Sequence, residues 1–417
     1  MGVSLDKYIS ASKMINFLND SKLMIPEGYG RGIPVYTDKG LGTINNFISL
    51  FKDTFKQIGI DFKELSGNKL IERKYFFKMY KGINDYSDEI VGFNDYLVMS
   101  DALIDSAYYL VDNYKGDNIT TLTISSIYRD KVDKLVPLYK DRNIYPVIQI
   151  DQLVTGDNYH KNIIKLKEFY IQFFNKIGID IAFLETSEVP NYAKNELYFL
   201  THDKGALTKV GMIYDLSQQF KNNLGVFKGV DFFDSGVSGK SLYKSLEISS
   251  LYGKSFLIHP NVAYTDLLIA HSNEGKYIDV KNRFDTEKIR YVNLNSTKKS
   301  YKIWKKSGIQ HYLLIHDFLT LFSKGANGEI KELLFNNIDD VIYKMKQDKI
   351  TVANEILERS RRILREIKSK YTVKMCKECY GKKCYGYYSD NNQYTCKSCK
   401  KNIDRLILNI DPKKRFY

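Results

Sequence analysis

The sequence predicts an α+β protein: a mostly antiparallel sheet flanked by helices, then a small α/β domain, then a short cysteine-rich module. Three observations predict this class. Helix and strand patterns fill residues 1–255, short buried strands alternate with helices over 256–370, and all five cysteines fall within 371–417. A chain of 417 residues is long enough for these three domains.

The first domain is expected to combine two helices with two strand pairs. Apolar side chains recur at helical spacing in two segments, and alternation of apolar and polar residues marks the strands. The predicted elements are helices over 40–60 and 160–179, paired strands over 119–130 and 143–153, and two strands over 196–220 around a Lys204-Gly205 turn. Strands that pair in sequence order favour an antiparallel sheet.

The pattern changes after residue 256. Short buried strands are expected in "TDLLIA", "YVNLN" and "HYLLIHD", and residues 341–370 are expected to form a long helix. Strands that alternate with helices predict a small α/β domain over 256–370.

The cysteines form a pattern typical of a structural zinc site. Cys376 and Cys379 are followed, after sixteen residues, by Cys396 and Cys399, so that each pair can place two thiolates at one point. Four thiolates complete a tetrahedral site and leave no open position for catalysis. Free thiols are the alternative. Cys384 is either a spare thiol or an alternate ligand.

Positive charge is concentrated at the C-terminal end. Residues 361–417 contain 16 Lys and Arg against 5 Asp and Glu, a net charge of +11, whereas the whole chain carries +14. A basic tail on a near-neutral body predicts a polyanionic partner, most simply nucleic acid; a solvated, solubilising tail is the alternative. The candidate contacts are Arg359, Arg361, Arg362 and Arg365 on the last long helix, and Lys413, Lys414 and Arg415 near the end.

Composition argues for an ordinary globular protein, with 43% hydrophobic and 27% charged residues. No apolar run approaches the roughly 18 residues that span a bilayer, and the first residues do not have the pattern of a signal peptide. We therefore expect a cytoplasmic protein without a membrane partner.

Residues 235–242, "SGVSGKSL", look at first like a phosphate-binding loop with a Gly-Lys-Ser at Gly239, Lys240 and Ser241. A P-loop needs Gly-x4-Gly-Lys-[Ser/Thr] between a strand and a helix. Gly236 lies too close to Gly239 for that spacing, so the pattern disfavours a P-loop.

The same segment, followed by "FLIHPNVAYTDLLIA" (256–270), resembles class II prolyl-tRNA synthetases, in which a Gly-Val-Ser-x-Arg motif precedes a Pro-x-Val-Ala strand. Other segments resemble the family in the same order: 29–47 its first motif, 127–145 its second motif, 210–220 its Thr-Ser-His segment, 301–318 and 353–367 its anticodon-binding domain. Archaeal and eukaryotic-type members also carry a C-terminal zinc-binding domain and end in tyrosine, as this chain does at Tyr417. The resemblance spans nearly the whole chain.

The resemblance implies a class II synthetase-like core, an anticodon-binding-like domain, a homodimer built on the first motif, and tRNA as partner. Such enzymes join an amino acid to the α-phosphate of ATP with the help of Mg²⁺ and fixed cations. The resemblance also implies catalytic roles for Arg129 and Lys240. It implies an amino-acid pocket formed by Ser100, Asp101, Met212 and Tyr214. The residues implied to contact ATP are Arg129, Asp130, Arg142, Lys209, Gln218 and Lys240.

Several of these positions depart from the family pattern. Lys240 stands in the place of the third-motif arginine, so it keeps the charge and loses the planar fork that grips phosphate at two points. Lys131 stands at an acidic position of the second motif. "PVIQID" (146–151) replaces Trp-Gln-Glu-Gly-His-Thr, and Met212, Ile213 and Tyr214 replace Thr-Ser-His.

Three functions remain open from the sequence. The first is a synthetase-like protein that binds tRNA or another nucleic acid, with impaired or altered amino-acid activation. The second is an active, divergent prolyl-tRNA synthetase that uses ATP. The third is a regulatory or structural partner that dimerises with a true synthetase and binds no RNA.

Overall fold

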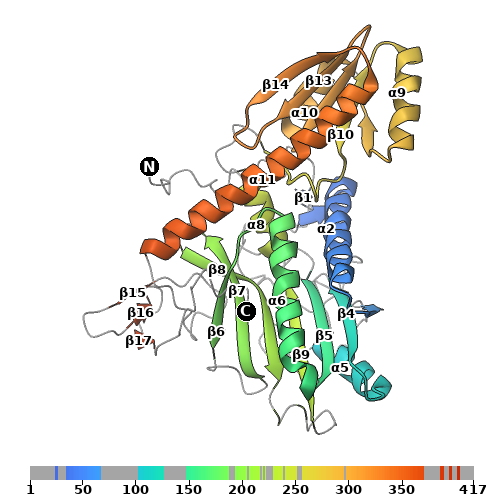
Figure 1. The fold of residues 1–417 in the computed structure, drawn as a ribbon. Coiled ribbons are helices and arrows are strands. Elements are labelled where there is room, and N and C mark those ends of the chain that lie inside the picture. The colour runs from blue at the N-terminus through green and yellow to red at the C-terminus, as the bar shows by residue number, and fades with distance from the viewer. Residues whose placement is uncertain are drawn as a thin grey trace.

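The computed structural model of the protein describes residues 24–26, 34–66, 102–125, 147–186, 193–203, 206–216, 218, 221, 229–237, 240–250, 256–294, 297–370, 386–388, 394–396 and 402–403. Within these residues, two sheets dominate the structure, and a long helix runs from one to the other (Figure 1).

The larger sheet has seven strands. Their order is β3 (Lys63–Ser66), β4 (Ile119–Ser125), β5 (Val147–Thr155), β9 (Val230–Val237), β8 (Ala206–Leu216), β7 (Ala193–Asp203) and β6 (Ala182–Thr186). Neighbouring strands are antiparallel except β3 and β4, which are parallel. The predicted α+β class is therefore confirmed, with a mixed sheet that is antiparallel at every other junction. The strand pair around 204–205 is also confirmed.

One face of this sheet packs against helices rich in aromatic residues. These are α2 (Asp38–Gln57) and α6 (Tyr159–Lys176), which follows the short 3-10 helix η4 (Gly156–Asn158). The ring of Phe51 lies 4.9 Å from the rings of both Phe169 and Phe173, centroid to centroid, and all three are fully buried. Edge-to-face packing of this kind adds stability beyond apolar burial. Both helices were predicted, and the turn after α2 places Gly59 at φ 67°.

The opposite face of the sheet is partly covered by α5 (Ala102–Asn113). Ala107 and Leu110 of this helix pack with Leu153, Leu216 and Phe232 in a second, smaller core. Successive strand residues point to opposite faces, so this core and the aromatic core lie on opposite sides of the same strands.

The smaller sheet has five strands in the order β11 (Tyr291–Asn293), β10 (Leu267–His271), β12 (His311–Ile315), β13 (Leu319–Lys324) and β14 (Ile330–Phe335). Strand β10 is parallel to both β11 and β12, and the remaining pairs are antiparallel. Helices α9 (Glu274–Thr286) and α10 (Thr297–Ser307) connect the parallel strands. The three predicted strands are confirmed; β13 and β14 were not predicted.

Helix α11 (Ile338–Lys370) extends from the five-stranded sheet to the seven-stranded sheet (Figure 1). It packs on α8 (Lys240–Ser249), a helix that follows β9 directly. Arg359 is 8% exposed and donates hydrogen bonds to the carbonyl oxygens of Ile248 (3.0 Å) and Ala326 (2.6 Å). It therefore joins α8 to the β13–β14 turn, and the expectation that Arg359 contacts nucleic acid is wrong.

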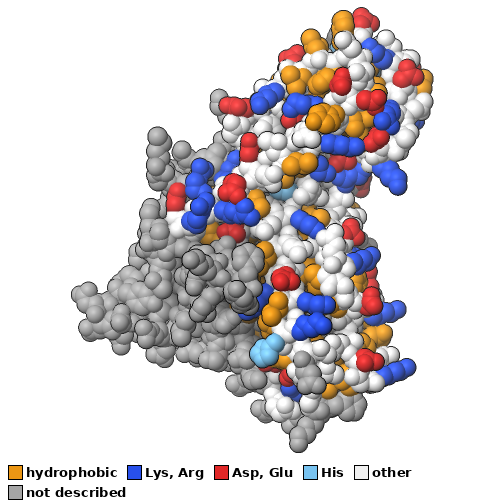
Figure 2. Space-filling view, in the orientation of Figure 1, with side chains coloured by type: hydrophobic (Ala, Val, Ile, Leu, Met, Phe, Trp, Pro, Cys, Tyr) orange, Lys and Arg blue, Asp and Glu red, His pale blue; other side chains and the backbone are white. Residues whose placement is uncertain are grey.

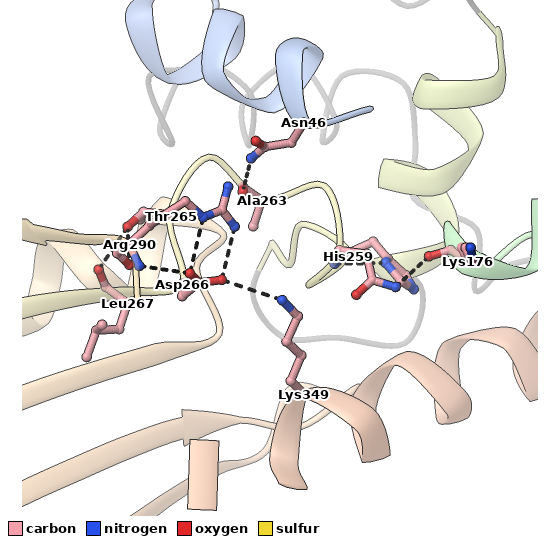
Figure 3. Close-up of polar contacts among 10 residues, drawn as sticks. Asn46, Lys176, His259, Ala263, Thr265, Asp266, Leu267, Arg290 and Lys349 are labelled. Atoms are coloured by element: carbon pink, nitrogen blue, oxygen red, sulfur yellow. Dashed lines mark hydrogen bonds and ion pairs between the residues drawn. The ribbon is translucent and has the colours of Figure 1, made fainter. Parts of the chain in front are cut away.

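The segment before β10 links the two sheets through side-chain contacts (Figure 3). Asn46 of α2 donates to the carbonyl oxygen of Ala263, and Asn261 donates to that of Lys176 at the end of α6 (2.8 Å). His259 is fully buried beside them, and burial lowers its pKa to about 3, so its ring stays neutral.

Two small sheets complete the described structure. Strands β1 (Met24–Pro26) and β2 (Pro34–Tyr36) form a pair, and β15 (Gly386–Tyr388), β16 (Tyr394–Cys396) and β17 (Asn402–Ile403) form a three-stranded sheet within the cysteine-rich segment. Among the described helices, none is both long and apolar enough to cross a membrane.

Candidate functional site

A group of polar and aromatic side chains lies on the face of the seven-stranded sheet opposite to α6. We call this group the acidic face; it consists of Gln149 and Asp151 of β5, Asp234 of β9, Lys209, Met212 and Tyr214 of β8, and Tyr198 of β7. The strand register places Asp151 opposite Asp234, Asp234 opposite Tyr214, and Met212 opposite Tyr198. Residues directly opposite each other project to the same side of a sheet, so these side chains form one surface.

Asp151 and Asp234 form a buried carboxyl pair at the centre of this face. Asp151 is fully buried and Asp234 is 6% exposed. Burial raises the pKa of Asp151 well above its ordinary value, and the charge of Asp234 and a hydrogen bond with it raise it further. The amide nitrogen of Gln149 donates to both carboxyl oxygens of Asp151, at 3.1 and 3.2 Å. This environment favours a protonated Asp151 that shares its proton with Asp234.

Lys209 supplies the cation of the acidic face. Its Nζ lies 4.4 Å from the centroid of the Tyr198 ring, 5.9 Å from that of Tyr214, and 3.5 Å from the Sδ of Met212. An ammonium group over an aromatic face is attracted by the quadrupole of the ring. The bulge between Phe199 and Leu200 alters the register next to Lys209.

The acidic face thus combines a carboxyl pair, the Lys209 ammonium and an apolar surface of tyrosine and methionine side chains. The ammonium group can pair with a carboxylate or phosphate, whereas the carboxyl pair can hold an ammonium group only when it is ionised. Gly236 faces Met212 on this side, and a Cβ there would lie 2.6 Å from the carbonyl oxygen of Ile148. Only glycine fits this approach of β9 to β5.

The structure brings together three of the side chains expected at an active site: Met212, Tyr214 and Lys209. Ile213, which lies between Met212 and Tyr214 in the sequence, points into the aromatic core on the other side and is 2% exposed. Gln218 is exposed, two residues beyond the end of β8. Whether any of these residues contacts ATP or an amino acid stays a prediction.

Lys240 and Ser241 of the Gly-Lys-Ser segment lie in the first turn of α8, and Lys240 is the first helical residue. Ser241 is fully buried and donates a hydrogen bond of 2.7 Å to the carbonyl oxygen of Val210 in β8. In a P-loop the equivalent hydroxyl binds Mg²⁺. A hydroxyl committed to a buried carbonyl supports the interpretation that the Gly-Lys-Ser here is not a phosphate loop.

Other predicted site residues lie outside the described residues. Of Lys240 the structure describes only the backbone, and the same holds for Cys396 at the end of β16. The others are Ser100, Asp101, Arg129, Asp130, Arg142, Cys376, Cys379, Cys399, Lys413, Lys414, Arg415 and Tyr417. In the part of the chain that the structure describes, no three His, Cys, Asp or Glu side chains are placed to hold a metal ion.

A second group of candidate residues lies at the carboxyl ends of the parallel strands of the smaller sheet. We call it the strand-end cluster: His271 at the end of β10, Ser272 after it, Tyr277 of α9, Asn293 of β11, and His316 after β12. The rings of His271 and Tyr277 stack with centroids 4.0 Å apart, Asn293 hydrogen-bonds to His271 (3.2 Å), and Ser272 hydrogen-bonds to His316. Ligands of open α/β sheets bind at the carboxyl ends of strands, where the connections diverge to the two sides.

Exposed groups near this cluster suit an unpaired nucleic-acid base. The ring of Phe318 is 57% exposed, and Lys276 donates to the backbone carbonyl of Asp317 beside it. Aromatic rings stack on bases, and amide and imidazole groups hydrogen-bond with their edges.

The expected basic residues of α11 lie near its C-terminal end. Arg362 and Arg365 are exposed, whereas Arg361 is half-buried and forms an ion pair with Glu358. In Figure 2, Lys and Arg side chains, interspersed with Asp and Glu, lie over this part of the surface. The side chains are therefore available for contact, and contact with nucleic acid stays a prediction.

Sequence reasoning missed both Asp234 and the role of Asp151. Each aspartate interrupts a strand of largely apolar residues, in "QIDQL" and "DFFDSG". A carboxylate in such a strand is costly to bury, so it is a signal of a special site. The pairing of the two carboxyls depends on the strand register, which the sequence does not reveal.

Comparison with solved structures finds a clear likeness to a Giardia lamblia prolyl-tRNA synthetase in complex with prolyl-adenylate. The TM-score is 0.63, the sequence identity is 12%, and the match covers 85% of this chain and 82% of that chain. A scan against models of protein families finds no match, and neither does a search of curated proteins. The fold is thus class II synthetase-like.

Proposed function

We propose that this chain is a prolyl-tRNA synthetase-like protein that binds tRNA, with impaired or altered amino-acid activation. The observation that carries the proposal is the fold, since the likeness to a prolyl-tRNA synthetase extends over 85% of the chain. The ring of Phe318, 57% exposed beside the strand-end cluster, supplies a stacking group for unpaired bases. The net charge of +11 over residues 361–417 supplies attraction for phosphates.

Binding of purified tRNA over a range of salt concentrations tests the proposal. Charge-driven binding weakens as salt rises, and each lost phosphate contact reduces the slope of log K against log salt by about 1. We expect the variant with Arg361→Gln, Arg362→Gln and Arg365→Gln to bind more weakly and with a smaller slope.

A matched control removes three exposed lysines from the larger domain, with Lys56→Gln, Lys63→Gln and Lys161→Gln, and so carries the same net charge as the arginine variant. Equal losses in both variants would show a general charge effect and no defined surface. Absence of tRNA binding at low salt would refute the proposal and favour a partner protein that binds no RNA.

The altered activation is proposed from the acidic face. Met212 and Tyr214 replace polar residues that hold the substrate in the resembled family, and they lie beside a carboxyl pair that favours a shared proton. A protonated pair is a weak partner for an ammonium group.

An active ligase is the second candidate, and the position of Lys209 favours it. Its ammonium and the carboxyl of Asp234 lie on one face with two tyrosines, which suits an amino acid with ATP and Mg²⁺ as co-substrates. Pyrophosphate exchange into ATP with each of the twenty amino acids separates the two candidates. Exchange with proline alone would establish a prolyl-tRNA synthetase, exchange with another amino acid would establish an altered specificity, and no exchange would support the binding protein.

Two structural proposals accompany this function. One structural zinc ion is proposed to be bound by Cys376, Cys379, Cys396 and Cys399. Elemental analysis that finds two zinc ions or none per chain would contradict this proposal. The chain is proposed to form a homodimer through residues 29–58, and a monomer by sedimentation would contradict that.

A further inference from the structure

A cavity of about 150 Å³ lies where the smaller sheet meets α11 and the segment that links the two sheets. Its lining includes Pro260, Ile289, Gln310, Lys288, Lys346 and Lys349. It is formed at the amino ends of β10 and β12, so it lies at the opposite edge of the sheet from the strand-end cluster. A cavity of this size accepts a benzene-sized ring.

Gln310 is an unexplained polar residue of the cavity lining. Its side chain is 4% exposed, and within the described structure neither its amide nitrogen nor its amide oxygen has a hydrogen-bond partner. A buried amide without partners is costly, so its presence calls for a partner that the described residues do not supply. The terminal torsion of glutamine is broad, which lets the amide turn toward a ligand.

The lysines around the cavity are not all neutralised. Lys346 pairs with Glu287 (2.9 Å) and Lys349 pairs with Asp266 (3.5 Å). The Asp266 carboxylate also accepts three hydrogen bonds from Arg290, two from its guanidinium and one from its backbone N–H (Figure 3). Lys288 is exposed and forms no ion pair with the described residues, and its backbone has φ 55°.

Such a backbone conformation is uncommon for a residue with a Cβ. Lys288 nevertheless lines the cavity, and its exposed side chain has no acidic partner among the described residues.

We propose that this cavity binds a nucleotide, with a pyrimidine-sized ring against Gln310 and the phosphate against Lys288. The apolar lining suits the ring faces, one amide offers a donor and an acceptor to a base edge, and the free cation suits a phosphate. The nucleotide is either a free nucleoside monophosphate or an unpaired nucleotide of an RNA chain. This inference does not rest on the proposed function, because it uses neither the strand-end cluster nor the arginines of α11.

Equilibrium dialysis of the full chain against UMP, CMP, AMP and GMP tests the proposal, with uridine and inorganic phosphate as partial ligands. We expect UMP or CMP to bind at least about tenfold more tightly than the purine nucleotides, and more tightly than uridine or phosphate. The Gln310→Met variant keeps the side-chain shape and should weaken UMP binding at least about tenfold without changing phosphate binding. The exposed Lys288→Gln variant should weaken both, and Lys331→Gln on β14 serves as the charge-matched control.

The outcomes separate the two sources of the ligand. A short single-stranded RNA that displaces UMP indicates an RNA nucleotide, and an RNA that fails to displace it indicates a free nucleotide. UMP binding that is lost in neither variant, phosphate binding as tight as UMP, or no saturable binding at about 1 mM would overturn the proposal. If the unmodified protein binds UMP but no tRNA, the proposed function is refuted and the present inference stands.

Discussion

The carboxyl pair of the acidic face makes a sharp prediction about stability against pH. Asp151 holds a raised pKa because it is fully buried beside Asp234, whereas its unfolded value is 3.8. Above pH 3.8 the unfolded chain loses this proton and the folded chain retains it, so the free energy of unfolding falls as pH rises. One retained proton corresponds to a slope of up to about 1.4 kcal/mol per pH unit, until the pH passes the folded pKa.

The Asp151→Asn variant removes the contribution of Asp151 to the pH dependence of the free energy of unfolding, with little change of side-chain shape. An asparagine amide offers one donor group and one acceptor, as the protonated carboxyl does, so it can hydrogen-bond with Asp234 and accept from Gln149. We expect the variant to gain stability relative to the unmodified protein as pH rises from about 4 toward neutrality.

Urea denaturation followed by far-ultraviolet circular dichroism, from pH 4.5 to 8, measures this difference. Taking the difference between the two proteins removes the contribution of other titrating groups. The exposed Asp279→Asn variant is the control for the loss of one carboxyl group at the surface. A flat difference for Asp151→Asn, or one in which the variant loses stability as pH rises, would refute the reasoning.

Three further predictions concern the scaffold. Phe51→Ala, at a fully buried ring, should lower the free energy of unfolding in urea by about 3–5 kcal/mol, whereas Leu41→Ala on the same helix, 47% exposed, should cost less than about 1 kcal/mol; similar losses would contradict the packing. Lys324→Met should abolish a rise of stability between pH 7 and 10, because burial lowers the pKa of Lys324 from 10.5 to about 7; an unchanged pH profile by thermal denaturation would count against it. Arg359→Met should cost at least about 3 kcal/mol in urea, since two buried carbonyls lose a charged donor, whereas Arg362→Met should stay within about 0.5 kcal/mol; equal effects would show that Arg359 is not structural.

Periodicity predicted the framework of both domains well. Helices α2 and α6 begin and end within a few residues of the predicted 40–60 and 160–179, because an apolar stripe at helical spacing has only one way to be buried. The hairpin around 204–205 was equally clear. Strands β13 and β14 were missed, and β14 has exposed positions such as Leu334 that blur its alternation.

The sequence by itself determined the α+β class, the order of helices and strands, and the family likeness that the fold comparison supports. Only the tertiary structure decided which polar residues meet. Asp151 and Asp234 are 83 positions apart in the sequence and face each other because β5 and β9 pair in one register. The structure also showed that Arg359 is buried and that Gln310 lines a cavity. Local patterns fix helices and strands through short-range sterics and burial, whereas strand register and helix docking depend on contacts between distant segments, which no local pattern encodes.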